Sequence, residues 1–238
     1  MSLVTDTARW LADGEHWTGP DGVPARTAEH LYVSGSAVLL AAALALPLAF
    51  WLGHAGRGGG LVVGLSNASR AVPTFAVLVL LVATPVGFGD RATILALVLF
   101  AVPPILTNAY VGVRDVDRDA REAARGMGMS GLQLLRRVEV PLALPLVAAG
   151  LRTASVQVVA TATLAAYVGG GGLGRLIADG FGRADPAMTA AGGVLVALLA
   201  LVVELSLGAV QRRVTPGPRT ARRGLPPVAV DAAPAPQA

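Results

Sequence analysis

Five stretches of this chain are long, apolar and almost free of charge, and they limit its possible folds more than any other feature. The hydrocarbon core of a bilayer is about 30 Å thick, so a helix that crosses it needs roughly 20 apolar residues. Residues 31–52 carry no charge at all. The other candidate spans, with only scattered charges, polar residues or prolines, are residues 61–86, 92–113, 141–166 and 187–210. We therefore predict an all-α membrane protein with about five transmembrane helices.

The composition agrees with a membrane protein and excludes several function classes. Charged residues make up 14% of the chain, whereas soluble proteins carry roughly 25%. The chain has no cysteine, which excludes disulfides, thiolate metal sites and cysteine nucleophiles. All 19 basic residues are arginine, so the lysine of an ATP-binding P-loop is missing. His16, His30 and His54 lack the spacing of metal ligands, and we expect no catalytic centre, no metal and no cofactor.

The arginines indicate how the chain is oriented in the membrane. Five spans divide them into twelve on one side and five on the other, with two inside spans. Because cytoplasmic loops are enriched in positive charge, we predict a multi-pass cell-membrane protein with its N-terminus outside and its C-terminus in the cytoplasm. Residues 1–30 are then an extracytoplasmic segment and residues 31–213 the transmembrane domain. Residues 214–238, rich in proline and alanine, are expected to be a disordered cytoplasmic tail beside anionic lipid.

The longest predicted loop, residues 114–140, lies on the arginine-rich side and holds 11 charges. Alanine, glutamate and arginine between 119 and 125 favour a helix, which Gly126 and Gly128 would end or bend. A second amphipathic piece starts at Leu132, so we predict a helix–turn–helix outside the membrane. A solvated connector is the alternative. Small residues on an exposed helix argue for the first interpretation, because they let the backbone of another protein approach closely.

A glycine cluster follows the fourth span. Gly169-x-Gly171-x-x-Gly174 fits a dinucleotide-binding pattern, but that pattern is informative only between a strand and a helix, and here it lies between two spans. We predict a tightly turned, partly embedded segment where a pore narrows, with a flexible outer loop as the alternative. Its candidate residues are Gly169, Gly171, Gly172 and Gly174. The apolar plugs of the corresponding outer gate would be Leu173, Leu176, Ile177 and Phe181.

Polar residues inside the apolar spans either make interhelical hydrogen bonds or line a pathway. The positions that we assign to the pathway are Asn108, Tyr110, Thr161, Thr163 and Tyr167. Arg70 and Arg152 also lie within spans, where a charged side chain is costly. They either shape the pathway or have a structural role, such as pairing with backbone carbonyls or with Glu204, and the sequence leaves both roles open.

One motif of the long loop resembles a known family. Glu122-Ala123-Ala124, three residues, Gly128, nine residues and then Val138-x-Val140-Pro141 is similar to the cytoplasmic EAA motif of permease subunits in binding-protein-dependent ABC importers. The family pattern ends in Ile-x-Leu-Pro, so both aliphatic residues differ here in size only. The segments that resemble its osmoprotectant subfamily, which serves glycine betaine, carnitine, choline and related quaternary amines, are residues 70–74, 102–112, 123–129 and 168–174.

The resemblance covers about residues 31–211 and implies the type I ABC importer fold, with a coupling helix seated on a separate ATPase subunit. The chain itself would not be an enzyme but part of the pathway for an osmoprotectant. The coupling residues that it implies are Glu122, Ala123, Ala124, Gly126, Gly128 and Pro141. Further implied partners are an extracytoplasmic solute-binding protein and a second permease copy or sister permease, with no nucleic acid. The alternatives are an importer for amino acids such as methionine and a secondary transporter, although no internal repeat is visible.

Overall fold

The computed structural model describes residues 2–215 of the chain, and this part contains helices and no strands. The helices are α1 (Leu3–Ala12), α2 (Val23–Ala55), α3 (Gly59–Ala71), α4 (Thr74–Val82), α5 (Asp90–Arg114), α6 (Arg118–Gly126), α7 (Gly131–Leu134), α8 (Val140–Thr161), α9 (Gly174–Gly182) and α10 (Pro186–Val214). Shorter helical turns occupy Gly14–Trp17, Leu135–Glu139 and Ala162–Val168. The expected tail lies outside the described residues, apart from Val214 and Thr215.

Four helical stretches are long and apolar enough to cross a membrane, and a bent pair of shorter helices brings the number of candidate spans to five if the pair is one span. The continuous ones are Val23–Ala55, Asp90–Arg114, Gly131–Val168 and Pro186–Val214. The second predicted span is instead the pair α3 and α4, which are bent by 83° relative to each other. Pro73 explains the break, because it holds the preceding Val72 in an extended conformation (φ −91°, ψ 122°). The prediction of about five transmembrane helices is confirmed.

Small residues set the packing of the long helices. Ala37, Ala41, Ala45 and Ala49 form a fully buried stripe along α2. They face α5, which lies between α2 and α8 and contacts both along its length. In a membrane, small residues let helix backbones approach closely, and the van der Waals contacts so gained drive association. The centre of the bundle is therefore a tight three-helix contact of α2, α5 and α8.

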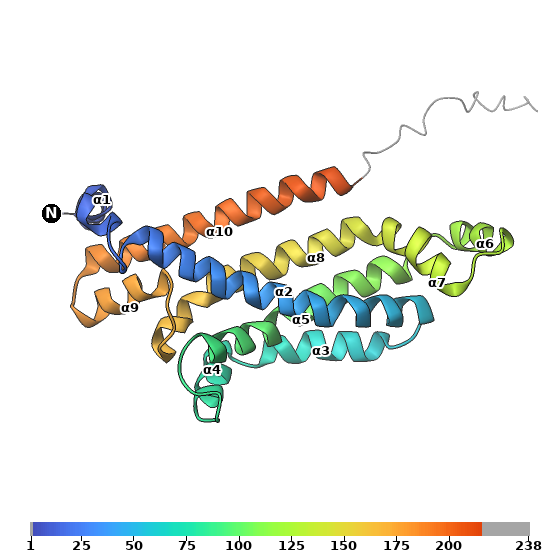
Figure 1. Cartoon of the computed structure of the whole chain (residues 1–238), viewed down its shortest axis with the longest axis horizontal. Helices are drawn as coiled ribbons and strands as arrows, with labels where there is room; N and C mark the ends of the chain where they lie inside the picture. Colours follow the sequence, from blue (N-terminus) through green and yellow to red (C-terminus); the bar gives the residue numbers. More distant parts are fainter. Residues whose placement is uncertain (1, 216–238) are drawn as a thin grey trace, which may run out of the picture.

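The bundle has two ends that differ in composition (Figure 1). At one end lie α1, α9 and the glycine cluster, which we call the glycine end. At the other end lie α6 and α7, together with the end of α2, which we call the arginine-rich end. Helix α10 runs along α8, and its early turns pack against α1 and α9 at the glycine end (Figure 1).

Helix α2 begins at Val23, eight residues before the predicted span. Its first turns carry Arg26 and Glu29, which the apolar pattern does not include. Arg26 donates to Glu29 on the same helix (2.9 Å) and to Asp21 before it, so the charges are paired with each other. Pro24 favours a start here, because a proline in the first turn lacks only an N–H that has no helical partner.

Candidate functional site

The helix predicted between residues 119 and 125 is α6, Arg118–Gly126. The side chain of Asp117 caps it by accepting from the Asp119 N–H (2.7 Å). Glu122 is exposed and accepts from Arg118 one turn earlier (2.8 Å). Ala123, Gly126 and Gly128 are also exposed, whereas Ala124 is buried. The helix thus presents small side chains to its surroundings and keeps its acid paired within its own segment.

The second helix of the predicted helix–turn–helix is not a separate piece. It begins at Gly131 with a capping box between Ser130 and Gln133 and runs without a break into the fourth span. Pro141 lies in the first turn of α8 and lacks the N–H of a regular helix. A wider turn over Leu135–Glu139, in which the Val140 N–H reaches the Leu135 carbonyl, accommodates the proline. Movement of this part of the loop is therefore movement of a transmembrane helix.

The structure reveals one buried acid that the sequence analysis did not single out. The Glu139 side chain is 1% exposed, and its Oε2 lies 2.6 Å from His54 Nδ1 at the end of α2. Its Oε1 lies 3.1 Å from Arg121 Nε on α6, as an ion pair rather than an aligned hydrogen bond. The signal in the sequence was a single charge in the aliphatic run Val-Glu-Val-Pro, immediately before a span.

A small polar cavity of about 190 Å³ lies between α3, α5 and α8. Asn108 is part of it and donates from Nδ2 to the Pro104 carbonyl (2.8 Å). The other described lining residues are uncharged and are Ser66, Ser69, Phe100, Pro103, Pro104, Thr107, Thr153 and Gln157. The side chain of Arg70 lies outside the described part of the chain, so the structure says nothing of its role. The cavity thus presents hydroxyl and amide groups between the spans.

The other predicted pathway residues lie elsewhere. Tyr110 is buried near the arginine-rich end, and its hydroxyl accepts from Arg114 (3.3 Å). The hydroxyls of Thr161 and Thr163 donate to carbonyls of the preceding turn, 2.7 Å and 2.9 Å away. Tyr167 is half exposed and meets Phe75 of α4 edge-on, with 6.2 Å between ring centroids. The structure therefore brings Asn108 to the cavity, and does not bring Tyr110 there.

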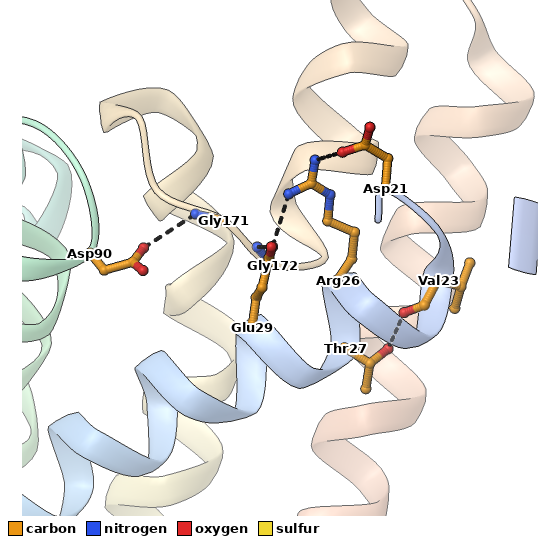
Figure 2. A network of polar contacts seen from close by, with 8 residues as sticks. All are labelled: Asp21, Val23, Arg26, Thr27, Glu29, Asp90, Gly171 and Gly172. Carbon is orange, nitrogen blue, oxygen red and sulfur yellow. Dashed lines mark hydrogen bonds and ion pairs between the residues drawn. The ribbon is translucent and has the colours of Figure 1, made fainter. Parts of the chain in front are cut away.

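Residues 169–174 make a tight turn that two carboxylates hold from outside, as Figure 2 shows. The Gly171 N–H donates to Asp90 at the start of α5 (3.3 Å), and the Gly172 N–H donates to Glu29 on α2 (2.8 Å). Gly172 has φ +91°, a conformation that other residues adopt only at a cost. Two elements distant in sequence thus meet at this turn through backbone groups.

These contacts are possible only because the glycines of this turn have no side chains. A Cβ at Gly171 would overlap the Glu29 carboxylate, and one at Gly174 would overlap the Thr163 carbonyl oxygen. A Cβ at Gly169 would reach the Phe88 side chain at 3.4 Å. The glycines therefore allow close approach of α2, of the residues before α5 and of the preceding helical turn.

The apolar residues after the turn are packing residues of one chain. Leu173 and Leu176 are buried against Val23 and Val196, and Ile177 packs against the same cluster. Phe181, by contrast, is exposed. Because α9 is amphipathic and lies between the start of α2 and α10, its apolar side fills that contact. Leu173, Leu176 and Ile177 thus pack within the chain, and their role as apolar plugs of an outer gate stays a prediction.

Arg152 is paired within the bundle. It contacts Glu204 on α10, and its Nη1 donates to Gln211, two turns further along the same helix (3.0 Å). Gly208 lies over the guanidinium group, so the helix backbone comes close to it. Of the two roles left open by the sequence, the structure contains the pairing with Glu204, which links α8 to α10.

Comparison with known proteins places the chain in a family. Residues 41–216 match the family described as binding-protein-dependent transport system inner membrane component. The glycine betaine/carnitine/choline transport system permease protein OpuCB of Bacillus subtilis is 38% identical over 80% of this chain and 88% of its own length. The carnitine transport permease protein OpuCB of Listeria monocytogenes is 40% identical over 84% and 91%.

A solved structure supports the fold. The MetNI methionine ABC transporter in an inward-facing conformation matches with a TM-score of 0.70, at 22% identity, over 82% of this chain and 96% of the matched chain. The predicted type I ABC importer fold is confirmed by this likeness, which concerns the fold alone. On the family match and the two permease relatives, the chain belongs to the inner membrane components of binding-protein-dependent transport systems, as a permease subunit of the ABC importer type.

Proposed function

We propose that this chain forms part of the membrane pathway of an ATP-driven importer for an osmoprotectant such as glycine betaine, carnitine or choline. A separate ATPase subunit hydrolyses ATP. The observation that carries the proposal is α6, an exposed helix with small residues, joined by a short turn to a helix that continues through the membrane. The relatives named for glycine betaine, carnitine and choline support the substrate class.

The ATPase docks on α6. Ala123, Gly126 and Gly128 leave room for its surface, and Glu122 stays paired with Arg118 and supports the helix electrostatically. Ala124 packs inward and fixes the helix on the bundle. Pro141 lies where the loop helix passes into α8. A push on α6 then changes the tilt of a span, which is how ATP binding biases the pathway between two states.

The solute passes between uncharged polar groups. Asn108 and the hydroxyls of the cavity offer hydrogen bonds without a fixed charge, which suits a zwitterion or a quaternary cation that must also leave. Thr161, Thr163 and Tyr167 continue towards the glycine end, where Gly169, Gly171, Gly172 and Gly174 narrow the path. A solute-binding protein delivers the solute at this end, and a second permease copy or sister permease completes the pathway.

The orientation follows the arginines. The arginine-rich end faces the cytoplasm and anionic lipid, and the N-terminus lies outside. Because the chain has no native cysteine, single cysteines test this directly. Asp119→Cys on α6 should react with a membrane-impermeant maleimide only after the cells are opened, and Glu15→Cys should react in intact cells. Labelling of Asp119→Cys from outside would contradict the proposal.

Transport assays test the function itself. Cells or proteoliposomes with the permease, its ATPase and its binding protein should accumulate labelled glycine betaine, carnitine or choline, and an inactive ATPase should abolish uptake. A cysteine crosslinker on Asp119→Cys should capture the ATPase subunit. Uptake that continues without the ATPase would indicate a secondary transporter. Uptake of labelled methionine alone would indicate an amino-acid importer.

A further inference from the structure

At the arginine-rich end, four elements meet around the buried carboxylate of Glu139. His54 comes from the last turn of α2, Arg121 from α6 and Glu139 from the turn that opens α8. Arg121 also donates from Nη2 to the carbonyls of Val113, and of Arg114 at 3.2 Å, where α5 ends. The last carbonyls of a helix lack helical partners and carry partial negative charge, so a guanidinium is favourable there.

The buried carboxylate of this cluster is stable only while its partners stay in place. A buried carboxylate is unfavourable unless it is paired, and removal of one partner leaves an uncompensated charge. Glu139 has two partners on two different helices, and Arg121 uses separate nitrogens for the acid and for the α5 carbonyls. A guanidinium can do this because its N–H donors are spread over a wide planar fork, whereas the donors of an ammonium group share one nitrogen. The three side chains are therefore held in one geometry.

The connections along the chain show why the contact matters. Helix α6 is joined to α5 by Asp115–Asp117 and to the helix leading into α8 by a short turn. Helix α2 has no such link, since His54 and Glu139 are 85 residues apart in sequence. A side chain at Gly131 would approach His54 Nε2 at 3.3 Å, so the glycine leaves room for the imidazole beside α7. Arg121 reaches from α6 to the spans, whereas Arg118 and Glu122 of the same helix pair with each other.

We propose that Glu139, Arg121 and His54 form a joint that makes α2 and α5 follow α6 when the ATPase moves it. These three are positioning residues for energy coupling. The inference rests on the proposed function, in which α6 receives the ATPase. It goes beyond the docking surface, because none of the three belongs to the exposed small-residue face of α6.

The test measures solute transported per ATP hydrolysed, in proteoliposomes with the ATPase, the binding protein and labelled glycine betaine. Glu139→Gln keeps the shape of the side chain and removes its charge. It should lower transport per ATP at least tenfold while ATP hydrolysis and the amount of bound ATPase change less than twofold. Arg137→Gln removes a charge of the opposite sign from an exposed residue two positions earlier; it controls for the loss of any charge in this segment and should keep the wild-type ratio.

A second variant guards against a loss of folding. Arg121→Lys keeps the positive charge, but a single ammonium group cannot contact both Glu139 and the α5 carbonyls. It should assemble with the ATPase and lower the ratio of transport to hydrolysis in the same direction. Glu139→Gln and Arg121→Lys combined should be no worse than the more severe single variant, because both break one contact.

A distance measurement reports the joint without transport. Spin labels on Arg57→Cys, just after α2, and Asp119→Cys on α6 should give a narrow distance distribution that Glu139→Gln broadens. The inference is overturned if both variants assemble and keep the wild-type transport per ATP, or if the labelled pair stays equally narrow. Failure of the proposed function is a separate outcome, recognised by a wild-type chain that binds no ATPase or transports without ATP.

Discussion

The two ends of the bundle are held by opposite means. At the arginine-rich end, the Arg121 guanidinium and the His54 imidazole, which lie on different helices, meet the buried Glu139 carboxylate. At the glycine end, Glu29 and Asp90 accept from the backbone N–H groups of Gly172 and Gly171, two residues that lack side chains. The contact at the arginine-rich end depends on the side chains of Glu139, Arg121 and His54. The contact at the glycine end depends on the absence of Cβ atoms in the glycines of the turn.

This difference has mechanical consequences. A contact between locked side chains transmits displacement, because moving one helix drags the charged partner along rather than leaving it buried and unpaired. A carboxylate on a backbone N–H can leave without rearranging any side chain of the turn. The arginine-rich end is thus suited to transmit movement, and the glycine end to open and close. Substitutions that add atoms should damage the glycine end, and substitutions that remove charge should damage the arginine-rich end.

The largest effect is expected at Gly174. A methyl group there overlaps the backbone oxygen of Thr163, which cannot move as a flexible side chain would. Gly174→Ala should therefore destabilise the chain by about 3 kcal/mol, the upper part of the range for overpacking, and lower the thermal midpoint of the purified protein. Gly182→Ala, also in α9 but with open space around it, is the control and should leave the midpoint unchanged. Equal midpoints for both variants would remove the steric argument.

Gly171→Leu should act on transport more than on stability. Its side chain displaces the Glu29 carboxylate, which is the flexible end of a side chain, and the Gly172 N–H loses its acceptor. Uptake should fall about tenfold, with normal amounts of chain in the membrane and of bound ATPase. Glu29→Gln retains an acceptor oxygen and should have a smaller effect. Normal uptake by Gly171→Leu would show that this turn does not shape the pathway.

The sequence predicted local features well and long-range pairing poorly. The helix at 119–125 was found because alanine, arginine and glutamate favour it and a glycine ends it, all within a few residues. The first span was drawn over the uncharged residues 31–52 alone, whereas helix α2 begins at Val23. It includes Arg26 and Glu29, which pair with each other, and Arg26 also pairs with Asp21 before the helix. Local pattern cannot show that two charges satisfy each other.

The same reason explains Glu139 and Arg152. Both are charges in or beside apolar runs, and their roles depend on partners that the chain brings from far away. For Arg152, the pairing with Glu204 was among the alternatives that the sequence left open. Glu139 was counted among the charges of its loop, because no nearby residue indicates that it contacts His54, 85 residues away on α2. The packing of Leu173 and Leu176 was missed for a related reason, since their partners Val23 and Val196 lie on α2 and α10.

A smaller effect is expected at the turn after α6. Gly128 has φ +81° with open space where a side chain would be, whereas Gly126 has open space without this conformation. Gly128→Ala should cost about 1 kcal/mol through backbone strain alone, whereas Gly126→Ala should not lower the stability of the isolated chain in thermal unfolding. If Gly126→Ala nonetheless weakens ATPase binding, as measured by co-purification, the added methyl group clashes with the ATPase. Gly126 then lies in the docking face of α6.

The smallest effect is expected for Arg118→Ala, and it separates the two kinds of charge at the arginine-rich end. Arg118 pairs with Glu122 at 2.8 Å, but both side chains are exposed, at 88% and 56%. Such a pair one helical turn apart contributes about 0.3 kcal/mol, so the thermal midpoint should scarcely move and added salt should erase the difference. Glu139 and Glu122 are both acids that pair with an arginine of α6, and they differ in that Glu139 is buried. If Arg118→Ala lowers transport per ATP as much as Arg121→Lys does, burial is not what distinguishes the joint, and coupling depends on the net charge of α6 instead.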